Sequence, residues 1–197
     1  MPLLSRIALA SILFEGGLGL LAVGLAWAVG VSLGDQIAWQ WDALWWGTAA
    51  ALPAVAAAVL GMHVPWRPLV RLRALVEETI VPLFRDCSLI DLAVIALAAC
   101  VSEELFFRGL VQAWSADIFG TGWGLAVGSL VFGLFHPISR TYVVLAVVMG
   151  AWLGWLWIVS GNLLTAIVCH AVYDYLALIY LTRRARSGER PKNNFPV

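Results

Sequence analysis

The sequence predicts an all-α fold: a polytopic membrane helix bundle of about six transmembrane helices with one interfacial amphipathic helix. The first observation is composition, since 62% of the 197 residues are hydrophobic, 12% are charged and the mean hydropathy is +0.89. A water-soluble globule of this size rarely has such a composition. The second is the length of the apolar stretches, because a transmembrane helix needs about 20 mainly apolar residues. Six such stretches lie near residues 6–33, 43–62, 88–112, 121–138, 141–159 and 162–182.

The first stretch admits two interpretations. Arg6 ahead of a long apolar run is also typical of a secretory signal peptide. Glu15 and the length of the run favour a span that is retained in the protein.

The interval between the second and third stretches, residues 62–87, is the longest polar interruption. Its basic, acidic and apolar residues alternate in a helical rhythm, which predicts an amphipathic helix along the cytoplasmic interface. Further along, Gly150 and Gly154 have the GxxxG spacing that favours close packing of helices. We expect one integral membrane domain at 1–182. The polar, proline-containing segment 183–197 is predicted to be a disordered cytoplasmic tail.

The distribution of basic residues predicts the orientation. They follow the second, fourth and sixth stretches: Arg67, Arg71, Arg73 and Arg85, then Arg140, then Arg183, Arg184, Arg186, Arg190 and Lys192. By the positive-inside rule these regions and both termini are cytoplasmic. The topology suggests a bacterial inner membrane. The net charge is zero, and nothing in the sequence indicates a nucleic-acid partner.

The three cysteines, Cys87, Cys100 and Cys169, are odd in number and have no CxxC spacing. They lie in or beside apolar segments, so we expect buried thiols.

Charged residues inside a membrane span cost several kcal/mol and usually have a task. We weigh seven ionisable residues in the predicted spans. They are Glu15, Glu103, Glu104, Arg108, His136, His170 and Asp174. Glu104 and Arg108 are spaced i, i+4, which allows an ion pair, whereas Glu103 points about 100° away. These three could merely satisfy one another. One arginine cannot neutralise two carboxylates, however, so one glutamate is left to be protonated or to bind something else.

The two histidines have suggestive neighbours. His136 precedes Pro137, and Asp174 follows His170 by one turn, where it could orient the imidazole or help to bind a metal or water. A membrane histidine can also simply hydrogen-bond a neighbouring helix. Together with Glu103, on three separate helices, these residues suit the activation of water, with or without a metal. Counting along straight helices places His136 about 10 Å or more from Glu103 and His170 in depth. Tilt, a short fourth span or a bend at Pro137 could bring them together, and we give the motifs more weight than this count.

The order of three motifs adds a resemblance. EELFFR at 103–108, FGLFH at 132–136 and HAVYD at 170–174 match EExxxR, FxxxH and HxxxN or HxxxD. The chain thereby resembles the CPBP family of intramembrane proteases, which contains CAAX prenyl endopeptidases and bacteriocin self-immunity proteins. The similarity covers a protease core at about 88–182.

The resemblance implies that Glu103 activates the catalytic water and that His136 and His170 complete the site, with Glu104 and Arg108 in support. Asp174, at the last position of the third motif, is counted with the catalytic residues. Asp174 stands where the prenyl endopeptidases typically have asparagine, which weakens a CAAX-specific interpretation. The cofactor is expected to be none or a divalent metal such as zinc. If a metal is bound, its ligands would be Glu103, His136 and His170.

We therefore expect an intramembrane endopeptidase that hydrolyses a peptide bond near a membrane-embedded or lipidated segment. Its partners would be a membrane-anchored protein or peptide and the lipid bilayer. The alternative is a non-proteolytic immunity or peptide-binding protein. A proton-coupled carrier would use similar carboxylates, but carriers often have paired repeats, and none is visible here.

Overall fold

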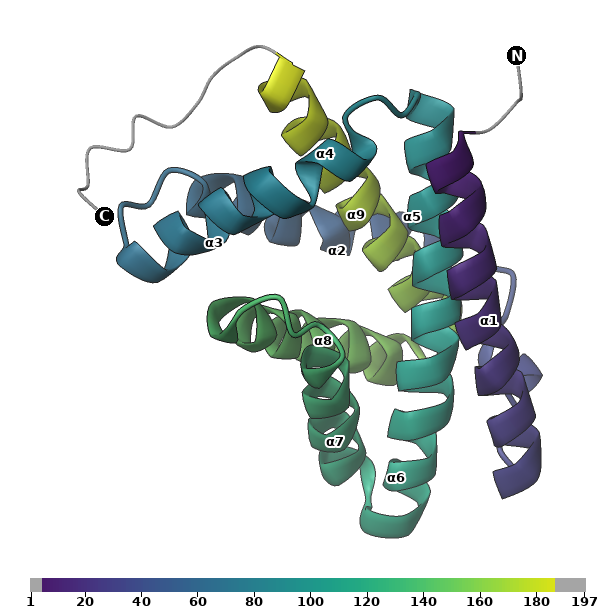
Figure 1. The fold of residues 1–197 in the computed structure, drawn as a ribbon. Coiled ribbons are helices and arrows are strands. Elements are labelled where there is room, and N and C mark those ends of the chain that lie inside the picture. Colours follow the sequence, from purple (N-terminus) through teal and green to yellow (C-terminus); the bar gives the residue numbers. More distant parts are fainter. Residues whose placement is uncertain (1–4, 187–197) are drawn as a thin grey trace.

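The computed structural model describes residues 5–186, and this part of the chain is helical apart from turns and loops (Figure 1). The all-α prediction is confirmed. The elements are α1 Arg6–Val29, η1 Gly34–Gln36, α2 Trp41–Gly61, α3 Arg67–Thr79, α4 Val81–Phe84, α5 Leu89–Glu104, η2 Leu105–Gln112, α6 Ala113–Phe119, α7 Thr121–Leu134, α8 Arg140–Ser160 and α9 Leu163–Arg186. η1 is a short 3₁₀-helix and η2 is a π-helix.

Four helices, α1, α2, α8 and α9, are long and apolar enough to cross a membrane. Large apolar side chains on their outer faces are exposed, among them Leu13, Phe14 and Trp27 of α1, as expected for contact with lipid. The third predicted span is the continuous run α5–η2–α6, and the fourth is the shorter α7. The chain is thus an integral helical membrane protein in which six is an approximate count of spans.

α7 is shorter than its predicted span of 121–138. Its 14 residues extend about 21 Å at 1.5 Å per residue, less than the ~30 Å hydrocarbon core. His136 consequently lies in the turn between α7 and α8 rather than on a helix, which corrects the expectation of three helices carrying the site. Pro137 disfavours helical conformation in the residue before it, and the Ser139 side chain caps α8 by accepting from Tyr142 N.

The starts of α1 and α5 are joined at one end of the molecule. Ser88 and Asp91 form a capping box at the start of α5, and Asp91 Oδ1 also accepts from Ser5 N at 2.8 Å. The buried Ala8 and Leu92 pack there against Tyr175, Leu178 and Ile179 in the C-terminal half of α9, so α1 and α5 begin beside this part of α9.

The predicted amphipathic helix is α3, followed by the short α4. Its apolar face bears Leu69, Leu72 and Val76 and covers a cavity described below. Arg73 holds α3 against the end of α2 by donating to the carbonyls of Met62 and Val64.

The boundary of the predicted tail is corrected by four residues. α9 continues to Arg186, so residues 183–186 are helical, and positions 187–197 lie outside the described residues.

Candidate active site

Three side chains meet at the centre of the bundle. Glu103 lies in the last turn of α5, His136 in the α7–α8 turn and His170 in α9. Glu103 Oε2 is 3.9 Å from His136 Nε2 and 4.0 Å from His170 Nε2. The separation of about 10 Å or more in depth that straight helices would give is therefore absent, and the short fourth span named as one remedy is present. Since α7 ends early, its turn lies at the depth of Glu103.

Glu104 organises the buried side of the site. Its Oε1 accepts from Arg108 Nη1 and from His170 Nδ1, both at 2.8 Å. Arg108 also donates through Nη2 to Gly150 O at 3.2 Å, and its guanidinium lies 4.3 Å from the centre of the Phe132 ring. The ion pair predicted from the i, i+4 spacing is thus present and fully buried.

The residue that orients His170 is Glu104 and not Asp174. Asp174 Oδ2 lies 3.7 Å from the opposite nitrogen, Nε2, beyond hydrogen-bonding distance. The i, i+4 spacing made the pairing of His170 with Asp174 visible in the sequence. The pairing of His170 with Glu104 joins α9 to α5 and depends on how these two helices pack.

Hydrogen-bond partners define how both imidazoles are presented. A backbone carbonyl only accepts, so His136 Nδ1, 2.7 Å from Phe132 O, is the donor. The Glu104 carboxylate is paired with Arg108 and therefore ionised, so it can only accept. His170 Nδ1 is then the donor in its hydrogen bond to Glu104 Oε1. In their neutral forms both rings therefore turn an unprotonated Nε2 towards Glu103.

This presentation fits a divalent metal as well as a water molecule. Metal-ligating histidines commonly donate their second N–H to a carbonyl or carboxylate, as both rings do here. Ligands in a tetrahedral zinc site lie roughly 3.4 Å apart, given bonds of about 2.1 Å. The distances from Glu103 to His136 and His170 are slightly longer, 3.9 and 4.0 Å. To bind zinc, the two histidine nitrogens would have to move slightly closer to the Glu103 carboxylate.

The chain passes through the site as a π-helix. η2 begins directly after Glu104 and contains Arg108. Such wide turns are rare and occur frequently at functional sites. Gln36 Nε2 donates to Gly109 O at 2.9 Å and so satisfies one carbonyl of this segment. No local pattern in the sequence predicted it.

Two further polar groups lie at the site. Glu15 of α1 was noted as ionisable but was given no role; it interacts electrostatically with Asp174 and His170. Cys100 of α5 was expected to be only a buried thiol. It is buried, and its Sγ lies 3.6 Å from Asp174 Oδ2 as a donor. The sequence could have indicated that Cys100 lies near the site, because Cys100 precedes Glu104 by one helical turn.

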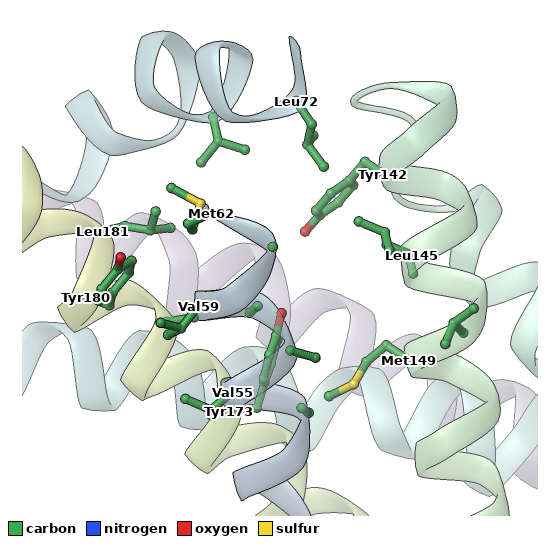
Figure 2. A pocket seen from close by; sticks show the side chains of 18 of the residues that line it. Val55, Val59, Met62, Leu72, Tyr142, Leu145, Met149, Tyr173, Tyr180 and Leu181 are labelled. Atoms are coloured by element: carbon green, nitrogen blue, oxygen red, sulfur yellow. The ribbon is translucent and has the colours of Figure 1, made fainter. Parts of the chain in front are cut away.

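A largely apolar cavity of about 520 Å³ adjoins the site (Figure 2). It is lined mainly by α2, α3, α8 and α9, and Tyr142 and Tyr173 extend into it from α8 and α9. His136 borders the cavity and also faces Glu103, so it connects the two regions. The sequence did not predict this cavity.

The fold and the site together define a class of protein: a helical membrane protein with carboxylates and imidazoles gathered inside its bundle. Residues 85–176 match the family model described as Type II CAAX prenyl endopeptidase Rce1-like. The resemblance inferred from the motifs is confirmed. No curated protein and no solved structure matches the chain.

The matched segment runs from just before α5 into α9 and includes Glu103, Glu104, Arg108, His136, His170 and Asp174. The family identifies a CAAX-type intramembrane endopeptidase in general terms. A protease of this kind acts on a peptide or prenylated protein in a membrane.

Proposed function

We propose that the protein hydrolyses a peptide bond beside a membrane-embedded or lipidated segment, using a water activated by Glu103. The observation that carries this proposal is the separation of Glu103 Oε2 from the two Nε2 atoms, 3.9 and 4.0 Å. These gaps are too long for direct hydrogen bonds, whereas a water bridging two groups spans up to about 5.5 Å. A water can therefore be held between the carboxylate and either ring.

In this mechanism Glu103 accepts a proton from the water as the oxygen attacks the peptide carbonyl carbon. The C–N bond then breaks, and Glu103 returns the proton to the departing amine. An Nε2–H of His136 or His170, present when that ring carries its second proton, donates to the developing oxyanion. Glu104 and Arg108 keep the His170 ring in place.

The apolar cavity supports a substrate with a lipid chain or an apolar segment. Its walls come mostly from aliphatic and aromatic side chains, and it borders His136. An apolar group held there would place the adjoining peptide near Glu103. Since Asp174 replaces the typical asparagine, we propose the lipidated or embedded class of substrate and not a particular prenyl group.

A metal-assisted route would use the same residues. Glu103, His136 and His170 would hold a divalent ion, which would supply a Lewis acid that polarises the carbonyl. Glu103 would then no longer be free as the base, so the metal-free route is the one we propose. Elemental analysis of active, chelator-treated protein separates the two: zinc whose removal stops cleavage and whose return restores it contradicts the metal-free route.

The test of the proposed function is Glu103→Gln, which keeps the shape of the side chain and removes the base. We expect cleavage of a fluorogenic peptide with a farnesylated C-terminal cysteine motif to fall about 10²–10⁴-fold. A matched control is Glu78→Gln at an exposed position of α3, and this variant should cleave normally. His136→Ala and His170→Ala should also lose activity. Appreciable cleavage by purified Glu103→Gln would rule out the assignment, and a peptide-binding protein would retain its activity in this variant.

A further inference from the structure

Cys100, His170 and Asp174 form a second cluster beside the proposed hydrolytic site. One ligand atom of each, the sulfur, an imidazole nitrogen and a carboxylate oxygen, lie within 4.8 Å of one another. Asp174 Oδ2 is 3.6 Å from Cys100 Sγ and 3.7 Å from His170 Nε2. Cys100 and His170 are buried, whereas the Asp174 side chain is 32% exposed and leaves a way in.

We propose that this cluster binds a thiophilic divalent cation such as Zn²⁺ or Cd²⁺. Thiolate, imidazole and carboxylate are all zinc ligands, and a sulfur ligand selects soft ions over Mg²⁺ or Ca²⁺. Glu104 accepts the Nδ1–H of His170, the arrangement that orients a metal-binding ring. The fourth ligand is a water or Glu103, whose Oε2 is 4.0 Å from His170 Nε2. The thiol proton, now donated to Asp174, leaves to solvent when the thiolate binds.

The cation and the hydrolytic reaction compete for one atom. His170 Nε2 faces both Asp174 and Glu103, and a nitrogen bound to a cation cannot hold the water or donate to the oxyanion. Occupation of the cluster therefore inhibits cleavage. This consequence rests on the proposed function, whereas the binding of the cation does not.

The other two cysteines provide matched controls. Cys169 precedes His170 in sequence, but it is buried in a core cluster with Leu153 and Ala166. Cys87 lies before α5, where its Sγ is 3.8 Å from Ser5 Oγ. Neither belongs to the metal-binding cluster.

The experiment is a Cd²⁺ titration of the full chain in detergent, after chelator treatment and with a reductant that contains no thiol. We expect one Cd²⁺ per chain, with ultraviolet thiolate-to-cadmium charge-transfer absorption. Cys100→Ser should lose this absorption and weaken binding by at least about tenfold, while Cys169→Ser and Cys87→Ser keep both. Cys100→Ala serves as a second variant, and helical circular dichroism identifies which proteins are folded.

Two results would overturn the site: absence of the absorption at saturating Cd²⁺, or the same absorption in folded Cys100→Ser. Inhibition is measured separately. Cd²⁺ should stop cleavage by the wild type and leave Cys100→Ser active at the same concentration. Binding without inhibition would overturn the competition for His170. If cadmium-free wild type cleaves nothing, the proposed function fails, while the absorption result still decides the cation site.

Discussion

At the scale of single residues, Glu104 holds the site together through more hydrogen bonds than its sequence neighbour Glu103. Its buried carboxylate joins Arg108 on the same helical run to His170 on α9. Removing one partner from a buried ion pair leaves the other charge uncompensated, which typically costs about 3–5 kcal/mol. Glu104 is therefore expected to stabilise the fold and to orient the imidazole together.

This difference predicts that Glu104→Gln loses more stability and more activity than Asp174→Asn. Glu104→Gln should lower thermal stability and reduce cleavage at least tenfold, because Arg108 loses its charged partner and His170 its oriented acceptor. Asp174→Asn should retain substantial activity, since Asp174 lies 3.7 Å from His170 Nε2 and does not orient the ring. Thermal unfolding in detergent and peptide cleavage measure the two effects. Equal losses in both variants would contradict the distinction between these carboxylates.

At the scale of elements, the α7–α8 hairpin determines where His136 lies. The two helices approach closely at Gly150, where an added Cβ would lie 3.0 Å from Ser129 Cα and 3.2 Å from its carbonyl oxygen. Backbone atoms of α7 cannot give way as a flexible side chain can. The close packing inferred from the GxxxG spacing is thus present at this glycine.

Gly150→Ala should therefore separate the hairpin and move His136 away from Glu103. We expect a loss of about 1–3 kcal/mol of stability, typical of overpacking, with reduced cleavage. The control is Gly24→Ala in α1, where nothing lies within 4 Å of an added Cβ and alanine is the better helix former. Both variants can be compared by thermal unfolding. A Gly150→Ala protein as stable and active as Gly24→Ala would exclude this role for the hairpin.

At the scale of the whole molecule, the helices outside the family match pack onto those within it. α1 lies along α5, and α2 lies along α9 and forms one wall of the cavity. We propose on this basis that residues 1–182 form one membrane domain. The start of α1 and the start of α5 also lie against the C-terminal half of α9, which places the first described helix and the second half of the last one on one side.

From the arginine distribution we propose that this side faces the cytoplasm, in a bacterial inner membrane. We expect a fluorescent protein fused at the C-terminus, or inserted between α2 and α3, to fluoresce in bacteria. Alkaline phosphatase at the same positions should be inactive, whereas phosphatase placed between α1 and α2 should be active. An active phosphatase at the C-terminus would overturn this topology.

The sequence by itself determined the features that depend on local spacing. Runs of apolar residues predicted the helices, and the i, i+4 spacing predicted the pair formed by Glu104 and Arg108, because neighbouring turns of one helix bring such residues together whatever surrounds them. The three motifs also named the residues that meet. Only the tertiary structure decided how deep His136 lies, that Glu104 rather than Asp174 orients His170, and that a cavity adjoins them. These features depend on where α7 ends and on how α5, α8 and α9 pack. Packing between helices is not encoded in the spacing of residues along the chain, so a periodic pattern could not predict it.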